Sequence, residues 1–145
     1  MEIKISQFCE EDIKEISENL QTDFDEFWNE NILTSEIKNE NTKYIKASIE
    51  NKIVGFAGIL INYDDIHVMN IVVRKDCRNN GIGKILMEAL IELAKKENKE
   101  SLTLEVNEKN IPAIKLYEKF NFEILGIRKK YYNGIDNAII MTLKF

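Results

Sequence analysis

A glycine loop at residues 78–84 is the clearest place in this sequence for ligand chemistry. It follows an apolar segment that ends at Val73 and opens a long amphipathic stretch. The first amides of a helix lack partners within the helix, and the helix dipole gives them partial positive charge. Glycine lets a phosphate approach these amides, and an arginine adds a charge-assisted contact. We therefore expect an anion site here, around Arg78, Gly81 and Gly83.

Two familiar phosphate-binding motifs do not fit this loop. A Walker loop needs glycine at the position of Arg78 and serine or threonine at the position of Ile85. A dinucleotide-binding loop that began at Gly81 would need a small residue where Leu86 stands. The pattern that remains is Arg/Gln-x-x-Gly-x-Gly/Ala, and a glycine-rich helix entry without a ligand is the plain alternative.

The loop and its neighbours resemble the GCN5-related N-acetyltransferase (GNAT) superfamily, whose signature loop binds the pyrophosphate of coenzyme A. The resemblance covers residues 53–143. Beyond the loop, four segments carry it: NIVV at 70–73, LEVN at 104–107, the helix and its end at 110–122, and the tail at 128–141. Within the superfamily the sequence looks most like the ribosomal-protein-alanine N-acetyltransferases, the RimI type. That combination is far more specific than the loop alone.

The resemblance implies acetyl transfer from acetyl-coenzyme A to an amine, which needs a base for the ammonium and an acid for the leaving thiolate. It assigns the base to Glu105 and the acid to Tyr117, and it places Tyr131 and Tyr132 at the acceptor peptide. Strand amides before the loop would polarise the thioester carbonyl. The implied contacts to the acetyl donor are Ile71, Val72, Val73, Arg78, Asn79, Asn80, Gly81, Ile82, Gly83, Lys84, Asn110 and Tyr117.

Each of these residues also has an ordinary structural interpretation. Glu105 can pair with a lysine at a strand end, and Tyr117 can pack its ring in the core. Asn110 can cap a helix without contacting a ligand. Tyr131 and Tyr132 can pack within a strand and turn, and we expect one of them in each role. The joint occurrence at family spacing favours the catalytic interpretation.

Hydrophobic periodicity predicts the elements that position these residues. Residues 51–52 form the turn of an antiparallel hairpin, and the strand, glycine loop, long helix and next strand form a right-handed crossover between near-parallel strands. The expected fold is an α/β (α+β) three-layer sandwich, with one mixed sheet of about seven strands and about four helices. We expect strands at 3–5, 44–50, 53–62, 66–73, 101–106, 122–126 and 138–144, and helices at 11–20, within 29–39, after Gly83, and from Asn110 to about Phe120.

Composition and charge limit the classes of protein to which this chain can belong. The chain has 145 residues, of which 44% are hydrophobic and 31% charged, so we expect one domain over residues 1–145. Cys9 and Cys77 form no CxxC pair, and His67, the only histidine, lies in an expected strand without a motif. This predicts reduced thiols, no metal site and no catalytic histidine. A net charge of −5 argues against nucleic-acid binding. Lacking a signal-peptide core and a long apolar run, the chain is expected in the cytoplasm, without a membrane partner.

The leading functional hypothesis is acetylation of a protein N-terminal α-amine, that of a ribosomal protein starting with alanine. A small amine, such as a polyamine, an amino acid or an aminoglycoside, is the alternative acceptor, since an acidic surface suits a cation. A third hypothesis is a protein that binds acyl-coenzyme A without catalysis. Three departures from the family pattern bear chiefly on the acceptor. Asn107 stands for an arginine, Asn121 for a glycine that a helix end requires, and Phe27-Trp28 for a Pro-Trp pair.

Overall fold

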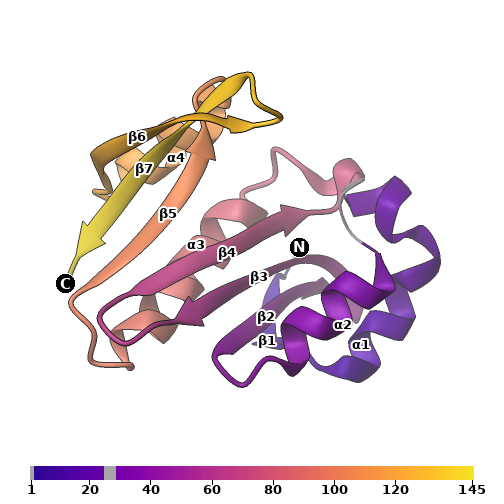
Figure 1. The fold of residues 1–145 in the computed structure, drawn as a ribbon. Helices are drawn as coiled ribbons and strands as arrows, with labels where there is room; N and C mark the ends of the chain where they lie inside the picture. Colours follow the sequence, from indigo (N-terminus) through magenta and orange to yellow (C-terminus); the bar gives the residue numbers. More distant parts are fainter. Residues whose placement is uncertain (1, 25–28) are drawn as a thin grey trace.

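A mixed seven-stranded sheet forms the centre of the molecule, in the order β1-β2-β3-β4-β5-β7-β6 (Figure 1). The computed structural model describes residues 2–24 and 29–145. Within them helices lie on both faces of the sheet, so the expected α/β three-layer sandwich is confirmed. The elements are β1 (Lys4–Gln7), α1 (Glu10–Ile16), α2 (Glu30–Lys38), β2 (Thr42–Ile49), β3 (Lys52–Ile61), β4 (Ile66–Val73), α3 (Ile82–Lys95), β5 (Ser101–Asn107), α4 (Ile111–Lys119), β6 (Glu123–Tyr132) and β7 (Asp136–Lys144).

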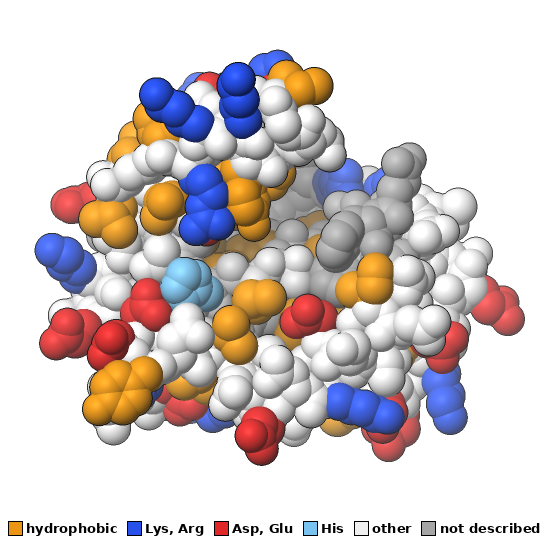
Figure 2. All heavy atoms as spheres, in the orientation of Figure 1, with side chains coloured by type: hydrophobic (Ala, Val, Ile, Leu, Met, Phe, Trp, Pro, Cys, Tyr) orange, Lys and Arg blue, Asp and Glu red, His pale blue; other side chains and the backbone are white. Residues whose placement is uncertain are grey.

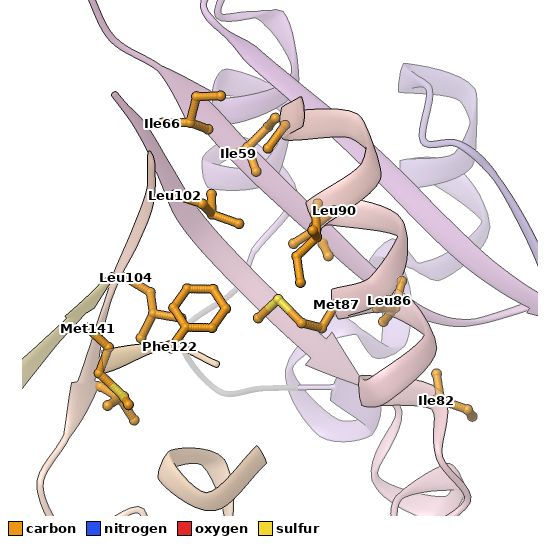
Figure 3. Packing of buried hydrophobic residues seen from close by; sticks show 14 of the residues in the cluster. Ile59, Ile66, Ile82, Leu86, Met87, Leu90, Leu102, Leu104, Phe122 and Met141 are labelled. Carbon is orange, nitrogen blue, oxygen red and sulfur yellow. The ribbon is translucent and has the colours of Figure 1, made fainter. Parts of the chain in front are cut away.

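Two hydrophobic clusters hold the layers together. On one face, α3 buries a stripe at helical spacing that includes Leu86, Met87 and Leu90, and this stripe packs on the sheet. Figure 3 shows these side chains directed at residues of the neighbouring strands and at Phe122. Each fully buried side chain of this size stabilises the fold by about 1.5–3 kcal/mol. On the other face, α1 and α2 pack a second cluster around Phe56.

The strands β4 and β5 run parallel but separate soon after they meet. Their pairing is at Ile66 with Leu102 and at His67 with Thr103, although β4 continues to Val73 and β5 to Asn107. Met69 is an extra residue in β4, where the register to β3 shifts, and such a bulge bends a strand. Figure 1 shows the two strands diverging toward their carboxyl ends. The sheet is therefore opened in its middle.

The structure corrects three expected boundaries. The hairpin turn between β2 and β3 consists of Glu50 and Asn51, both with positive φ, one residue earlier than expected. The first helix ends at Ile16 and continues as a 3₁₀ turn and a π turn to Phe24. β6 extends to Tyr132 instead of ending near Gly126, because its second half also pairs with β7. This half is exposed and lacks the apolar alternation from which a strand is predicted. Among the described residues, no helix has the length and apolarity to span a membrane.

Candidate active site

A cavity of about 500 Å³ lies where β4 and β5 separate and is closed on one side by the end of β6. Figure 2 shows the surface hollowed between the two halves of the sheet. The opening is a direct result of the short β4–β5 pairing, because paired strands would lie too close to leave space. The lining residues are His67, Val68, Met69, Asn70, Glu105, Tyr131 and Tyr132.

Glu105 supplies a carboxylate to this cavity. It lies on β5 opposite Ile140 of β7, and its side chain is 21% exposed. One oxygen, Oε1, lies 3.2 Å from Nη2 of Arg128, while the other, Oε2, is buried and has no protein partner. Buried polar atoms nearly always have hydrogen-bond partners, so an exception at a cavity is typical of a ligand or proton-transfer site.

Two tyrosines connect Glu105 to α4. Burial raises the pKa of Tyr132, and the negative charge of Glu105 raises it further. Burial likewise raises the pKa of Tyr117, with a smaller contribution from Tyr132. The Tyr117 ring packs against Phe122 at a centroid distance of 5.9 Å and lies against the core cluster under α3. The structure therefore brings Glu105, Tyr131 and Tyr132 together at the cavity, whereas Tyr117 is not among the lining residues.

The open edge of β4 presents backbone amides to the site. The amide of Arg74 donates to the carbonyl of Val54 on β3 at 2.8 Å. Because amide directions alternate along an antiparallel strand, the amide of Val72 also points to β3, whereas those of Ile71 and Val73 point the opposite way. They face the side from which β5 has separated, and thus suit a carbonyl or an extended ligand chain.

The glycine loop lies at the start of α3, as expected from the sequence. Gly81 has φ of 80°, which glycine adopts without strain, and the position of its missing Cβ has no atom within 4 Å. Arg78 binds the protein itself: its Nε donates to the Val73 carbonyl at 3.0 Å and its Nη2 to the Phe24 carbonyl at 2.8 Å. The loop backbone is thus open to an anion, while Arg78 holds the loop to β4.

Comparison with known proteins decides which chemistry this arrangement belongs to. Residues 7–122 match the model of the acetyltransferase (GNAT) family. The chain belongs to the GNAT acetyltransferase family. It is therefore an acyltransferase enzyme, and acetyl-coenzyme A is the acetyl donor of the family. A Bacillus anthracis acetyltransferase solved in complex with acetyl coenzyme A is 31% identical over 77% of this chain and 66% of its own, with a TM-score of 0.69.

Two further similarities point to one branch of the GNAT family. The [ribosomal protein bS18]-alanine N-acetyltransferase of Escherichia coli K12 is 34% identical over 121 residues, which cover 80% of each chain. The crystal structure of the ribosomal-protein-S18-alanine N-acetyltransferase from Escherichia coli superposes with a TM-score of 0.87 at 30% identity, over 99% of this chain and 94% of that one. The resemblance to the RimI type is thereby confirmed.

The remaining residues expected at the GNAT site occupy varied positions. Asn110 caps α4, since its Oδ1 accepts from the amide of Ala113 at 3.3 Å. Asn121 has φ of 71°, the left-handed conformation expected in place of glycine. Asn107 on β5 donates through its side-chain amide to Oδ2 of Asp136 at 3.2 Å. Phe27-Trp28 lies outside the described residues. No group of side chains that could hold a metal ion occurs in the described part of the chain.

Sequence reasoning missed several residues of the cavity. His67 lines it and lies 3.2 Å from Oδ2 of Asp65 through its Nε2. Asn70 lines it too and donates to the hydroxyl of the buried Tyr44 at 3.0 Å. The sequence signal for both was their place in the strand before the glycine loop, but only the separation of β4 and β5 shows that the site reaches back to His67.

Proposed function

We propose that this GNAT enzyme transfers acetyl from acetyl-coenzyme A to the N-terminal α-amine of a protein, that of a ribosomal protein that begins with alanine. The observation that carries the proposal is the buried, unpartnered Oε2 of Glu105 at a cavity beside Tyr131 and Tyr132. A cavity with a base at its inner end and aromatic walls suits the end of a peptide chain. The alanine preference follows from the similarity to the Escherichia coli enzyme.

Glu105 acts as the general base in this mechanism. Its Oε2 removes a proton from the acceptor ammonium, and the amine that results attacks the thioester carbonyl. We place the carbonyl oxygen, which gains negative charge, at the Ile71 and Val73 amides on the side that β5 leaves, because preorganised donors stabilise such charge. Tyr117 then gives its hydroxyl proton to the departing sulfur and recovers one from the acetylated nitrogen through solvent. The acceptor ammonium thereby loses two protons, one to solvent through Glu105 and one that replaces the proton given to sulfur.

The residues around the opening fit the acetyl donor. The Gly81 region offers helix amides with open space around them for the pyrophosphate. The loop residues Asn79, Asn80, Ile82, Gly83 and Lys84 lie in the same turn, where Ile82 has a buried side chain and contributes its backbone. Arg78 holds the loop in place and Val72 pairs β4 with β3, and we assign Asn110, at the start of α4, to a contact with the donor.

Tyr131 and Tyr132 form the acceptor side. Their rings meet edge to face at a centroid distance of 5.0 Å, and both line the cavity. Tyr131 is half exposed, whereas Tyr132 is more buried and has its pKa raised partly by the negative charge of Glu105, so we assign Tyr132 to the reacting end and Tyr131 to the following residue of the peptide. Aromatic rings of this kind provide contact area at low entropic cost.

Release of coenzyme A thiol tests this function directly. We offer peptides that differ only in their first residue, together with polyamines, amino acids and aminoglycosides. Turnover confined to peptides that begin with alanine or serine supports the proposal. Turnover confined to small amines would replace it by the alternative acceptor class. Tight binding of acetyl-coenzyme A without turnover on any acceptor would indicate a non-catalytic binder.

A further inference from the structure

Arg128 contacts the proposed catalytic base but is not itself placed at the reacting atoms. It lies on β6 with its side chain 53% exposed, and its Nη2 is 3.2 Å from Oε1 of Glu105. Its guanidinium also lies over the ring of Tyr131, 4.9 Å from the ring centroid. One side chain thus connects the carboxylate with the wall of the acceptor cavity.

The backbone of β6 fixes this arrangement. Arg128 pairs with Ala138 of β7, and the next regular pair is Tyr132 with Asp136, so three residues of β6 face a single residue of β7. Lys130 has φ of 52° within this irregular stretch, and its amide donates to Oδ1 of Asn137 at 2.9 Å. Tyr131 lies within this bulge, with the Arg128 guanidinium over its ring and the Tyr132 ring at its edge.

The surroundings of Glu105 offer no second contact of this kind. Tyr132 of the same strand and Tyr117 of α4 are neutral phenols whose pKa values are raised. His67 of β4 faces the cavity, but its imidazole lies against Asp65. Among the described residues, Arg128 is the permanent cation that forms an ion pair with Glu105.

We infer that Arg128 is a positioning residue for acetyl transfer, which holds Oε1 of Glu105 and leaves Oε2 directed at the cavity to take the proton. The inference rests on the proposed function. In the step concerned, an N–H bond of the acceptor ammonium breaks, its electron pair stays on nitrogen as the attacking lone pair, and an Oε2–H bond forms. The proton then passes to solvent.

A split between kcat and KM separates this role from a merely structural one. Hydrogen bonds to charged groups are among the stronger ones, so in Arg128→Gln we expect kcat to fall by about tenfold or more while KM for acetyl-coenzyme A stays unchanged. Arg128→Lys, which keeps a charged donor on β6, returns kcat toward the wild-type value.

Lys129→Gln is the matched control, because it removes the same charge from the next residue of β6. The assay uses any amine that the wild-type enzyme acetylates, and circular dichroism verifies the fold of each variant. A kcat of Arg128→Gln equal to that of Lys129→Gln would overturn the inference while the proposed function stands. Silence of the wild-type enzyme with every amine would overturn the proposed function, and the inference with it.

Discussion

At the scale of residues, the site combines a carboxylate with phenols that keep their protons. Burial raises the pKa of Tyr117, and Tyr132 adds to that effect. A phenol in this environment is protonated throughout the neutral range, which is the state an acid needs before it protonates a thiolate. Glu105 has one oxygen paired with Arg128 and one buried without a partner, so one oxygen is left for the proposed proton transfer.

Removing either proposed proton-transfer group should lower kcat while the affinity for acetyl-coenzyme A stays unchanged. Glu105→Gln keeps the shape of the side chain, and Tyr117→Phe keeps the ring that packs on Phe122. We expect a loss of about 10²–10⁴-fold in each, the usual size of one positioned proton transfer. Steady-state kinetics and calorimetric binding of the donor measure the two quantities. Glu123→Gln, at an exposed position of β6, is the control. A loss of kcat below about twofold in the Glu105 or Tyr117 variant would exclude that residue from proton transfer.

The raised pKa of Tyr117 also predicts how kcat depends on pH in the alkaline range. A tyrosine ordinarily loses its proton near about pH 10, and burial moves that loss higher. We therefore expect the kcat profile to show no descending limb from this residue below about pH 10. A descending limb near about pH 8 that disappears in Tyr117→Phe would contradict the direction of this shift.

At the scale of elements, the separation of β4 and β5 and the start of α3 together make the site. β4 exposes amides on the side that β5 leaves, and α3 begins close to where β4 ends. The left-handed Gly81 lets the chain turn into the helix with its first amides exposed. We therefore expect this junction to be sensitive to substitution at Gly81.

Gly81→Ala tests that dependence. Alanine at φ of 80° is strained, and we expect a loss of about 1–2 kcal/mol in the free energy of unfolding together with weaker donor binding. Gly126→Ala is the matched control, since an added Cβ there meets no atom within 4 Å and the φ is not left-handed. Denaturant titration and donor binding provide the readouts. Equal effects of the two substitutions would show that the Gly81 conformation is unimportant.

The same elements show what sequence reasoning can reach. Local signals predicted α3, α4 with its Asn110 cap, β4 and the left-handed Asn121, because periodicity, capping and turn chemistry are encoded within a few residues. The early loss of β4–β5 pairing is not encoded locally, so the reach of the cavity to His67 was missed. The second half of β6 was missed because Arg128, Lys129 and Lys130 show no apolar alternation. Glu105 was found only through the family resemblance, and its arginine partner only through the structure.

At the scale of the whole molecule, the two hydrophobic clusters hold an opened sheet together. The cluster under α3 includes Leu102 and Met141 on one side of the opening and Ile59 on the other, so the halves share a core. Tyr44 belongs to the second cluster, and its hydroxyl accepts from Asn70 at the cavity. A group buried in the core is thus joined by a hydrogen bond to the active site.

Tyr44 should make the protein less stable at alkaline pH. Burial strongly raises its pKa in the folded state, whereas in the unfolded chain the phenol ionises near about pH 10. The unfolded state then binds fewer protons, so stability falls above that pH by about 1.4 kcal/mol per pH unit. We expect Tyr44→Phe to flatten this decline in urea unfolding measured at several alkaline pH values. An unchanged slope would mean that Tyr44 ionises as easily in the folded state.

The most direct test of the proposed activity is where the acetyl group arrives. A peptide that begins with alanine and carries one internal lysine is incubated with the enzyme and acetyl-coenzyme A, and tandem mass spectrometry locates the modification. We predict a single acetyl group on the N-terminal α-amine, formed about 10²–10⁴-fold more slowly in the Glu105→Gln variant. Acetylation of the lysine side chain, or of neither amine while a polyamine in the same mixture is modified, would contradict the assignment of this cavity to a peptide N-terminus.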